Sequence, residues 1–442
     1  MDGISSLILL LLFLWSLFLQ RLAHIELTAP VAFVLLGLLL SEGIGVLDLA
    51  PSPGAVRTLA EVTLAWVLFT DAARLSFRVL RPELGLYVRL LLLGLPMCIG
   101  LGTLLAVGLL PGVSGWAALY VAAALAPTDA ALGATMMVNP VVPGRIRRLL
   151  NVESGLNDGI ATPFVVLALA GVSMAGSTSD AHTPGSALVE LAIGLVYGTV
   201  LGLIAGWGLR FALRKGWATE DVAGTGVLAL ALLSYTSAIA IGGNGFVAAF
   251  VAGLAFGSTH GAPHLVLLFI EQSASLFSVL VWLLFGAVLV PAAFDHLTWQ
   301  AALYAVLSLT VVRMVPVALS LAGSGLDRKT VLFVGWFGPR GLASVIFGLL
   351  AVEELAPPAW RSIVPVVVCT VLLSVVAHGI TSAPLAQRYG RASAVTSAPP
   401  APPAGPAGPA GPAGPAENDL PIRGMGAGTI GGHRRGRRDG HA

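Results

Sequence analysis

The chain has 442 residues, of which 56% are hydrophobic and only 10% are charged. Soluble domains carry about 25% charged residues, so this composition excludes a soluble globular protein and indicates one that crosses a membrane several times. The formal net charge of +2 is too small to indicate a nucleic-acid partner. Cys98 and Cys369 lie in apolar stretches, and we expect both to be buried apolar side chains, not a disulfide or a metal site.

Apolar stretches separated by polar, glycine and proline residues predict about thirteen membrane spans, because one span needs about 20 mostly apolar residues. The first stretch lacks a preceding basic region and a cleavage site, so we expect a retained helix and no signal peptide. The spans are expected at about 4–20, 28–41, 57–79, 85–110, 114–135, 149–174, 185–213, 223–241, 243–257, 266–293, 298–321, 330–352 and 359–386.

The basic residues indicate the orientation of these spans. Counted through the predicted spans, the loops on one side hold most of the Lys and Arg residues, among them Arg145, Arg148 and Lys215, whereas the opposite loops hold only Arg57 and Arg361. Basic loops stay on the cytoplasmic side. We therefore expect a multi-pass plasma-membrane protein with its N-terminus outside and its C-terminus in the cytoplasm.

The composition changes at about residue 391, where Ala-Gly-Pro repeats precede the basic sequence "GGHRRGRRDGHA". Such a segment has too few apolar side chains to bury a core. The sequence therefore predicts a membrane domain over 1–390 and a disordered cytoplasmic tail over 391–442. The basic end of the tail is expected to be solvated, or to contact anionic lipid headgroups.

A small set of ionisable residues lies deep inside the predicted spans. Each such charge costs about 2.5–3.5 kcal/mol on insertion scales, so it needs a compensating function or partner. The set comprises Asp71, Arg89, Asp129, Glu153, Asp158, Arg313 and Arg340. Arg89 is close enough to a span end for its side chain to reach the interface. Depths counted from the span ends place Asp71, Asp129, Asp158 and Arg340 near the midplane.

Two of these spans are interrupted beside a charge. The interrupting residues are Pro127 in "AALAPTDAALG", and Gly338, Pro339 and Gly341 around Arg340 in "VGWFGPRGLAS". Irregular backbone at membrane depth is tolerated where protein buries it or where it lines a cavity. Paired interruptions in two halves of a chain are typical of secondary transporters built from inverted repeats. The sequence thus predicts an all-α fold with two broken helices, about 114–135 and 330–352, crossing near the midplane.

The sixth span, which begins "NVESGLNDG", carries four polar side chains in two pairs. Glu153 lies four residues before Asn157, and Ser154 lies four residues before Asp158, so each pair shares a side of the helix. We expect Glu153 to pair with an arginine from the second half of the chain. Of the two candidates, Arg340 is favoured over Arg313. Asp158 is expected to face a cavity together with Ser154.

The sequences "PTDAAL", "ESGLNDG" and "FGPRGLAS" resemble the monovalent cation:proton antiporter-1 family, the NhaP-like sodium/proton exchangers, over residues 1–390. "LFTDAARLSF", which contains Asp71, looks like the acidic motif of that family's third helix, where Glu is more common. The resemblance implies exchange of Na⁺, or Li⁺, for H⁺, in a homodimer and without a cofactor or enzymatic activity.

The resemblance also implies roles for individual residues. Asp158 would bind the cation and the proton beside Asn157, and Ser154 would supply an oxygen ligand. Thr128 and Asp129 would belong to the unwound helix. Glu153 would form a supporting ion pair with an arginine.

The chemistry of the residues supports this interpretation. A small hard cation prefers several oxygen ligands, which Asp158, Asp71, Ser154 and a freed carbonyl near Thr128 supply. Burial favours the neutral form of a carboxylate, so a proton and a cation compete for it. Because Asn157 cannot carry an additional proton, we expect electroneutral exchange of one cation for one proton.

Other functions are also compatible with parts of the sequence. A K⁺/H⁺ antiporter would use the same ligand types. A passive cation channel is a further alternative, and the thirteen spans with a single pseudo-repeat argue against a symmetric pore. An intramembrane aspartyl protease would need Asp129 and Asp158 to share a proton, which leaves Asn157 and Arg340 unexplained. His260 and His264 have the spacing of metal ligands; the Gly and Pro between them disfavour a metal site and leave pH sensing open.

Overall fold

The protein is known from a computed structural model, which describes residues 3–24, 28–43, 53–75, 80–133, 136–137, 139–176, 184–259 and 263–397. The predicted tail lies almost wholly outside these residues, as do His260 and the side chain of His264. The described residues form helices and connecting segments without any strand, as the all-α prediction requires. Within them both cysteines are free; Cys98 is buried and Cys369 is partly buried.

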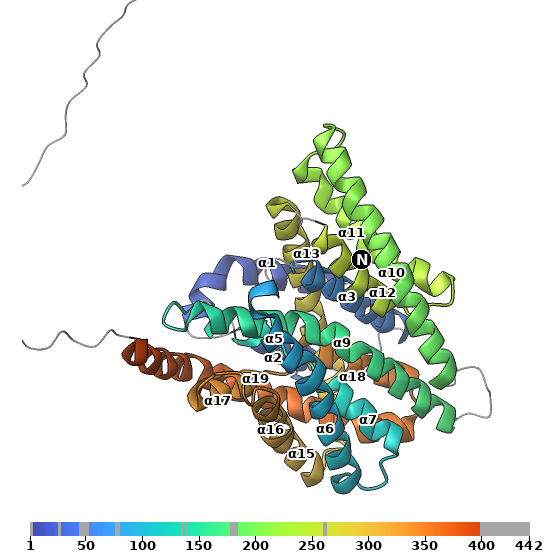
Figure 1. Ribbon diagram of the computed structural model, residues 1–442. Helices are drawn as coiled ribbons and strands as arrows, with labels where there is room; N and C mark the ends of the chain where they lie inside the picture. Colours follow the sequence, from blue (N-terminus) through green and yellow to red (C-terminus); the bar gives the residue numbers. More distant parts are fainter. Residues whose placement is uncertain are drawn as a thin grey trace, which may run out of the picture. The chain divides into compact units, whose positions relative to one another are not determined.

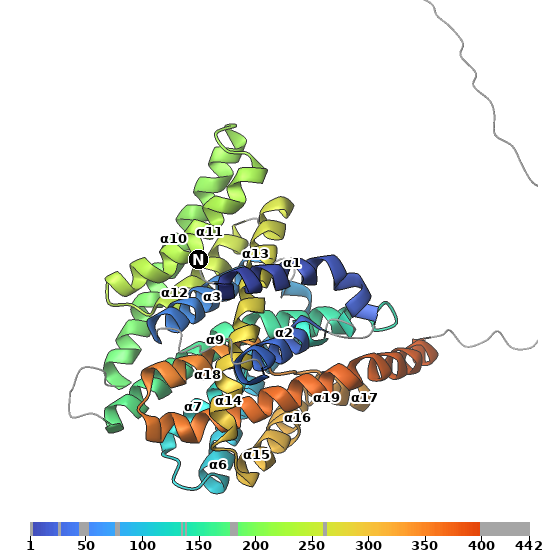
Figure 2. The ribbon, with the colours of Figure 1, turned by 180° about the vertical axis from the view of Figure 1, so that it is seen from behind.

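The helices form two groups that pack against each other. The first group consists of α2 (Ala29–Leu38), α3 (Pro53–Ala73), α10 (Pro184–Arg214), α11 (Glu220–Ala240), α12 (Gly245–Ser258) and α13 (His264–Leu284). Helix α2 continues into the π-helical η1 (Leu39–Gly43), and α13 continues through η5 (Phe285–Leu289) into α14 (Val290–Phe294). Helices α10, α11 and α12 lie in the upper part of Figures 1 and 2. The N-terminal helix is α1 (Gly3–His24).

The second group begins with η2 (Arg81–Glu83), α5 (Leu84–Val88), η3 (Arg89–Gly94), α6 (Leu95–Leu109), α7 (Gly115–Ala124), η4 (Ala130–Gly133) and α9 (Gly144–Gly176). It continues with α15 (Trp299–Leu309), α16 (Val311–Ser320), α17 (Arg328–Trp336), α18 (Leu342–Glu354) and α19 (Pro357–Ser397). Helices α6, α15 and α16 lie in the lower part of Figures 1 and 2. Helix α9 packs against α3, α10 and α12, so it joins this group to the first.

The same order of elements occurs twice in the second group. A helix is followed by a broken helix and a second long helix, first as α6, α7–η4 and α9, then as α15–α16, α17–α18 and α19. Both predicted breaks are present: α7 ends at Ala124, three residues before Pro127, and α17 ends at Trp336, just before the glycine-rich segment. Proline lacks the N–H that would continue the helix.

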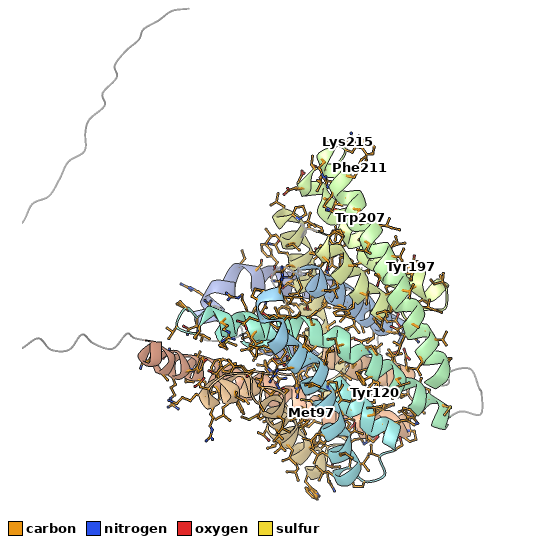
Figure 3. The ribbon with its side chains drawn as sticks, viewed as in Figure 1. Met97, Tyr120, Tyr197, Trp207, Phe211 and Lys215 are labelled. Atoms are coloured by element: carbon orange, nitrogen blue, oxygen red, sulfur yellow. The ribbon has the colours of Figure 1, made fainter. Side chains whose placement is uncertain are left out.

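Every predicted span overlaps a described helix. Among the residues that the structure describes, seven helical stretches are long and apolar enough to cross a membrane, judged by length and composition, and four apolar helices are shorter. The number of thirteen crossings stays a prediction. Along α10, Tyr197, Trp207 and Phe211 lead to Lys215 (Figure 3), and large apolar side chains such as Trp207 are exposed there. An apolar surface of this kind fits lipid tails or another protein.

Candidate ion-binding site

The two broken helices meet at their non-helical segments. The backbone N–H of Asp129 donates to the carbonyl of Pro339 across 2.8 Å. Each break leaves backbone groups without an intrahelical partner, and this bond satisfies one group from each break. The midplane crossing expected from the sequence is therefore built from direct contact between the two interruptions.

Two opposite charges neutralise the helix ends at this crossing. The Asp129 carboxylate accepts hydrogen bonds from the N–H of Leu342 (3.2 Å), where α18 begins, and from the N–H of Ala131 (2.8 Å) in η4. The Arg340 guanidinium donates to the carbonyls of Ala126 and Pro127, just past the end of α7. Helix N-termini carry partial positive charge and C-termini partial negative charge, so each side chain faces the end that its charge stabilises.

Glycines at the second break make room for charged groups from other elements. A β-carbon on Gly338 would overlap the guanidinium of Arg313, and one on Gly341 would overlap the carboxylate of Asp129. The sequence predicted both glycines as helix-breaking residues. The structure adds that the missing side chains are what allows these two charges to approach the backbone.

The partner of Glu153 is Arg313. The Arg313 Nη1 atom lies 2.6 Å from Glu153 Oε1, and the two side chains are only 4% and 3% exposed. The preference for Arg340 was wrong, because the guanidinium of Arg340 donates to carbonyls around the first break. Arg313 approaches from α16, which begins directly after Thr310, a residue with non-helical backbone angles (φ −106°, ψ −84°).

Three polar side chains fasten α9 to the first break. The Ser154 hydroxyl donates to the carbonyl of Thr128 (2.7 Å) and accepts from the N–H of Ala130 (2.8 Å). The Asn157 amide donates to Thr128 Oγ1 across 2.6 Å. Ser154, Asn157 and Thr128 are thus brought together as predicted, and their hydrogen bonds to one another fix the unwound segment against α9.

The Asp158 side chain differs from those of Ser154, Asn157 and Thr128 because none of the hydrogen bonds among the described residues fastens it to the first break. It is 8% exposed, and its Oδ1 atom is buried without a hydrogen-bond partner among the described residues. The charges of Asp71 and Asp129 are the ones that act on it. A buried carboxylate oxygen without a partner is costly, which marks the place where a proton or a cation would be stabilised.

A cavity of about 280 Å³ leads to this region. It is lined by Asp71, Arg74, Leu75, Asp129, Ala130, Ala131, Met137, Asn151, Ser154, Gly155 and Glu271. Asp71 lies on α3 of the first group and contacts α9 at Gly155. Asp71 and Ser154 therefore line the same cavity, whereas Asp158 and Thr128 do not belong to its lining. A cavity shared by Asp158 and Ser154 stays a prediction. Within the described residues, no three His, Cys, Asp or Glu side chains gather as ligands of a metal ion.

Two buried residues that complete the breaks were missed by the sequence analysis. The Ser344 hydroxyl donates to the carbonyl of Ala124 at the end of α7 (2.7 Å). His378 Nε2 lies 2.9 Å from the carbonyl of Trp336 at the end of α17. The signals were present: Ser344 ends the motif "FGPRGLAS", and His378 is a histidine inside a predicted apolar span.

This arrangement defines a class of protein. Paired broken helices that cross beside a buried, unpartnered carboxylate are the architecture of a cation-coupled secondary transporter. A family model described as "Sodium/hydrogen exchanger, transmembrane" matches residues 7–388. The chain therefore belongs to the sodium/hydrogen exchanger family, and the resemblance noted in the sequence is confirmed.

Individual relatives agree with this assignment. The chain is 27% identical over 310 residues to a Na⁺/H⁺ antiporter of Schizosaccharomyces pombe, a match covering 62% of this chain and 65% of the relative. It is 26% identical over 358 residues to the K⁺/H⁺ antiporter NhaP of Alkalimonas amylolytica, covering 79% of this chain and 61% of the relative. The chain thus spans somewhat less than two thirds of the length of these curated relatives.

The fold is also that of a solved structure. The sodium proton antiporter MjNhaP1 from Methanocaldococcus jannaschii, determined at pH 8, superposes with a TM-score of 0.70 at 19% identity. The match covers 87% of this chain and 98% of that chain. The predicted all-α antiporter fold with two broken helices is confirmed by this similarity.

Proposed function

We propose that this protein exchanges Na⁺, or Li⁺, for H⁺ across the plasma membrane, one cation for one proton, and so serves pH and sodium homeostasis. It works as a homodimer, with its N-terminus outside and its C-terminus in the cytoplasm. The observation that carries the proposal is Asp158, a buried carboxylate that makes no structural hydrogen bond at Oδ1. It therefore has a vacant acceptor for either ion.

Asp158 serves both ions in turn. When it binds H⁺, its charge is neutralised and no further ligand is needed. When it binds Na⁺, the Ser154 hydroxyl, the Thr128 oxygens and the Asp71 carboxylate complete an oxygen shell. Because one carboxylate cannot hold both ions, movement of one helix group past the other exchanges them across the membrane.

K⁺ is the second candidate cation, because the Alkalimonas relative is a K⁺/H⁺ antiporter. Carboxylate, hydroxyl and carbonyl oxygens also bind K⁺, and ligand type does not separate the two ions. The length of the Asp71 side chain affects the selectivity between Na⁺ and K⁺, since it sets how closely a carboxylate from α3 can approach a cation bound on α9.

The test uses purified protein in liposomes that contain a pH-sensitive dye. Na⁺, Li⁺ and K⁺ are added in turn, and we expect proton efflux with Na⁺ and Li⁺. Asp158→Asn should reduce this flux to that of protein-free liposomes while leaving the melting profile in detergent unchanged. Asp295→Asn, at an exposed aspartate, is the matched control and should exchange normally. Full flux in Asp158→Asn would refute the proposed mechanism.

A further inference from the structure

An ion pair between the end of α3 and the first half of α13 borders the cavity that Asp71 lines. Arg74 follows the last residue of α3, and its Nη2 atom lies 3.2 Å from Oε1 of Glu271 on α13. The two side chains are 39% and 50% exposed. Neither residue belongs to the site built by α7, α9 and α18, and the exchange mechanism above does not use them.

The pair lies where two cavities adjoin. The inner cavity, about 280 Å³, includes Asp71, Asp129 and Ser154 in its lining, as described above. An outer cavity of about 330 Å³ is lined by Arg74, Leu75, Arg148, Asn151, Val152, Leu267, Leu268 and Glu271. Both cavities have Arg74, Leu75, Asn151 and Glu271 in their linings, so the ion pair lies at their common boundary.

Arg74 and Glu271 also act electrically on the inner site. Arg74, Asp129 and Glu271 line the same cavity as the Asp71 carboxylate, so their charges act on it through a short distance. Arg74 repels a cation at Asp71, whereas Glu271 attracts one. While the two are paired, their effects largely cancel.

We propose that the Arg74–Glu271 pair is the gate through which the cation reaches Asp71, and that it sets the apparent affinity for the cation on that side. The arriving cation takes the place of Arg74 at Glu271 and then passes to Asp71. The inference rests on the proposed exchange function. In the proposed orientation the gate lies on the cytoplasmic side.

The strength of the pair suits such a gate. Solvent-exposed ion pairs contribute little net stability and are screened by salt, so a pair this exposed opens and closes readily at ambient temperature. A buried pair such as Glu153–Arg313 would resist opening. The exposed Arg74–Glu271 pair is therefore the one suited to opening, and the buried Glu153–Arg313 pair is the one suited to holding two helices together.

The test measures the cation concentration dependence of exchange in proteoliposomes of known orientation. Arg74→Gln should lower the KM for Na⁺ on the gate side about two- to fivefold, the range that corresponds to the net energy of one exposed pair. Glu271→Gln should raise KM by a similar factor, because the freed Arg74 charge then competes with the cation. The double variant should lie near the wild type, and kcat should stay within about twofold. Both shifts should shrink as choline chloride raises the ionic strength.

Arg145→Gln is the matched control, because Arg145 forms an exposed pair with Glu83 (2.6 Å) and lines neither cavity. It should leave KM unchanged. Three results would contradict the proposed gate. The KM for Na⁺ could shift in the same direction in Arg74→Gln and Glu271→Gln, the KM shifts could be insensitive to salt, or Arg145→Gln could shift KM by an equal factor. Absence of cation-driven proton flux in the wild type would instead overturn the proposed function, so the two failures are distinguishable.

Discussion

The buried pair of Glu153 and Arg313 allows a stringent test of the structure. The two charges are 2.6 Å apart and almost wholly buried. Removing one member of such a pair leaves an uncompensated buried charge and costs about 3–5 kcal/mol, whereas removing both charges is often nearly neutral. We therefore expect Glu153→Gln and Arg313→Gln to be strongly destabilised as single variants, and the double variant to be more stable than either.

The assay is thermal unfolding in detergent at a fixed scan rate, since unfolding of a protein of this kind is commonly irreversible. The melting temperature of the double variant should lie above that of each single variant, because the effects of contacting residues are not additive. Glu153→Gln combined with Arg340→Gln is the control. Because Arg340 bonds to carbonyls and not to Glu153, this combination should show no rescue. A Glu153–Arg313 double variant that melts as low as the worse single variant would show that the two charges do not stabilise each other.

Two further predictions follow from the neighbourhood of the breaks. The rate of exchange should not respond to an imposed membrane potential when the ions are otherwise balanced, because neutral Asn157 precedes Asp158 in α9. An exchange rate that follows the potential in valinomycin-clamped liposomes would contradict this prediction. His378→Leu should lower the melting temperature and slow exchange, since the Trp336 carbonyl loses its contact with the buried imidazole and keeps only the N–H of Gly338, at a net cost of about 0.5–1.5 kcal/mol. His378→Gln, which keeps an N–H donor, should retain more of both properties, and equal damage in the two variants would show that this bond is unimportant.

The breaks and the α9 cluster were predictable because local sequence determines them. Proline and glycine interrupt helices wherever they occur in a span, and Ser154, Asn157 and Asp158 share a helix whose geometry is regular. Their approach to Thr128 followed from comparing depths in neighbouring spans. Depth is readable from a sequence because the bilayer fixes the length of each span.

The partner of Glu153 was not predictable by the same reasoning. Arg313 and Arg340 are both deep, and the choice depends on which helix faces α9 and at what rotation. Arg340 lies in a broken helix, and the freedom of the backbone there favours a side chain that turns inward. The break itself supplies the competing acceptors, since the carbonyls of Ala126 and Pro127 lose their helical donors and bind Arg340 instead. That contact joins residues from distant parts of the chain, and only the folded structure shows it.

The charges at the crossing also explain why Asp158 is the group suited to exchange. Glu153 is neutralised by Arg313, and Asp129 and Arg340 face helix ends of opposite sign. Protonating Glu153 would leave Arg313 unpaired, and protonating Asp129 would weaken its bonds to two backbone amides. Asp158 has no ion-pair partner among the described residues and leaves Oδ1 free. Its charge can therefore be cancelled by H⁺ or by a cation without breaking any contact that holds the two broken helices together.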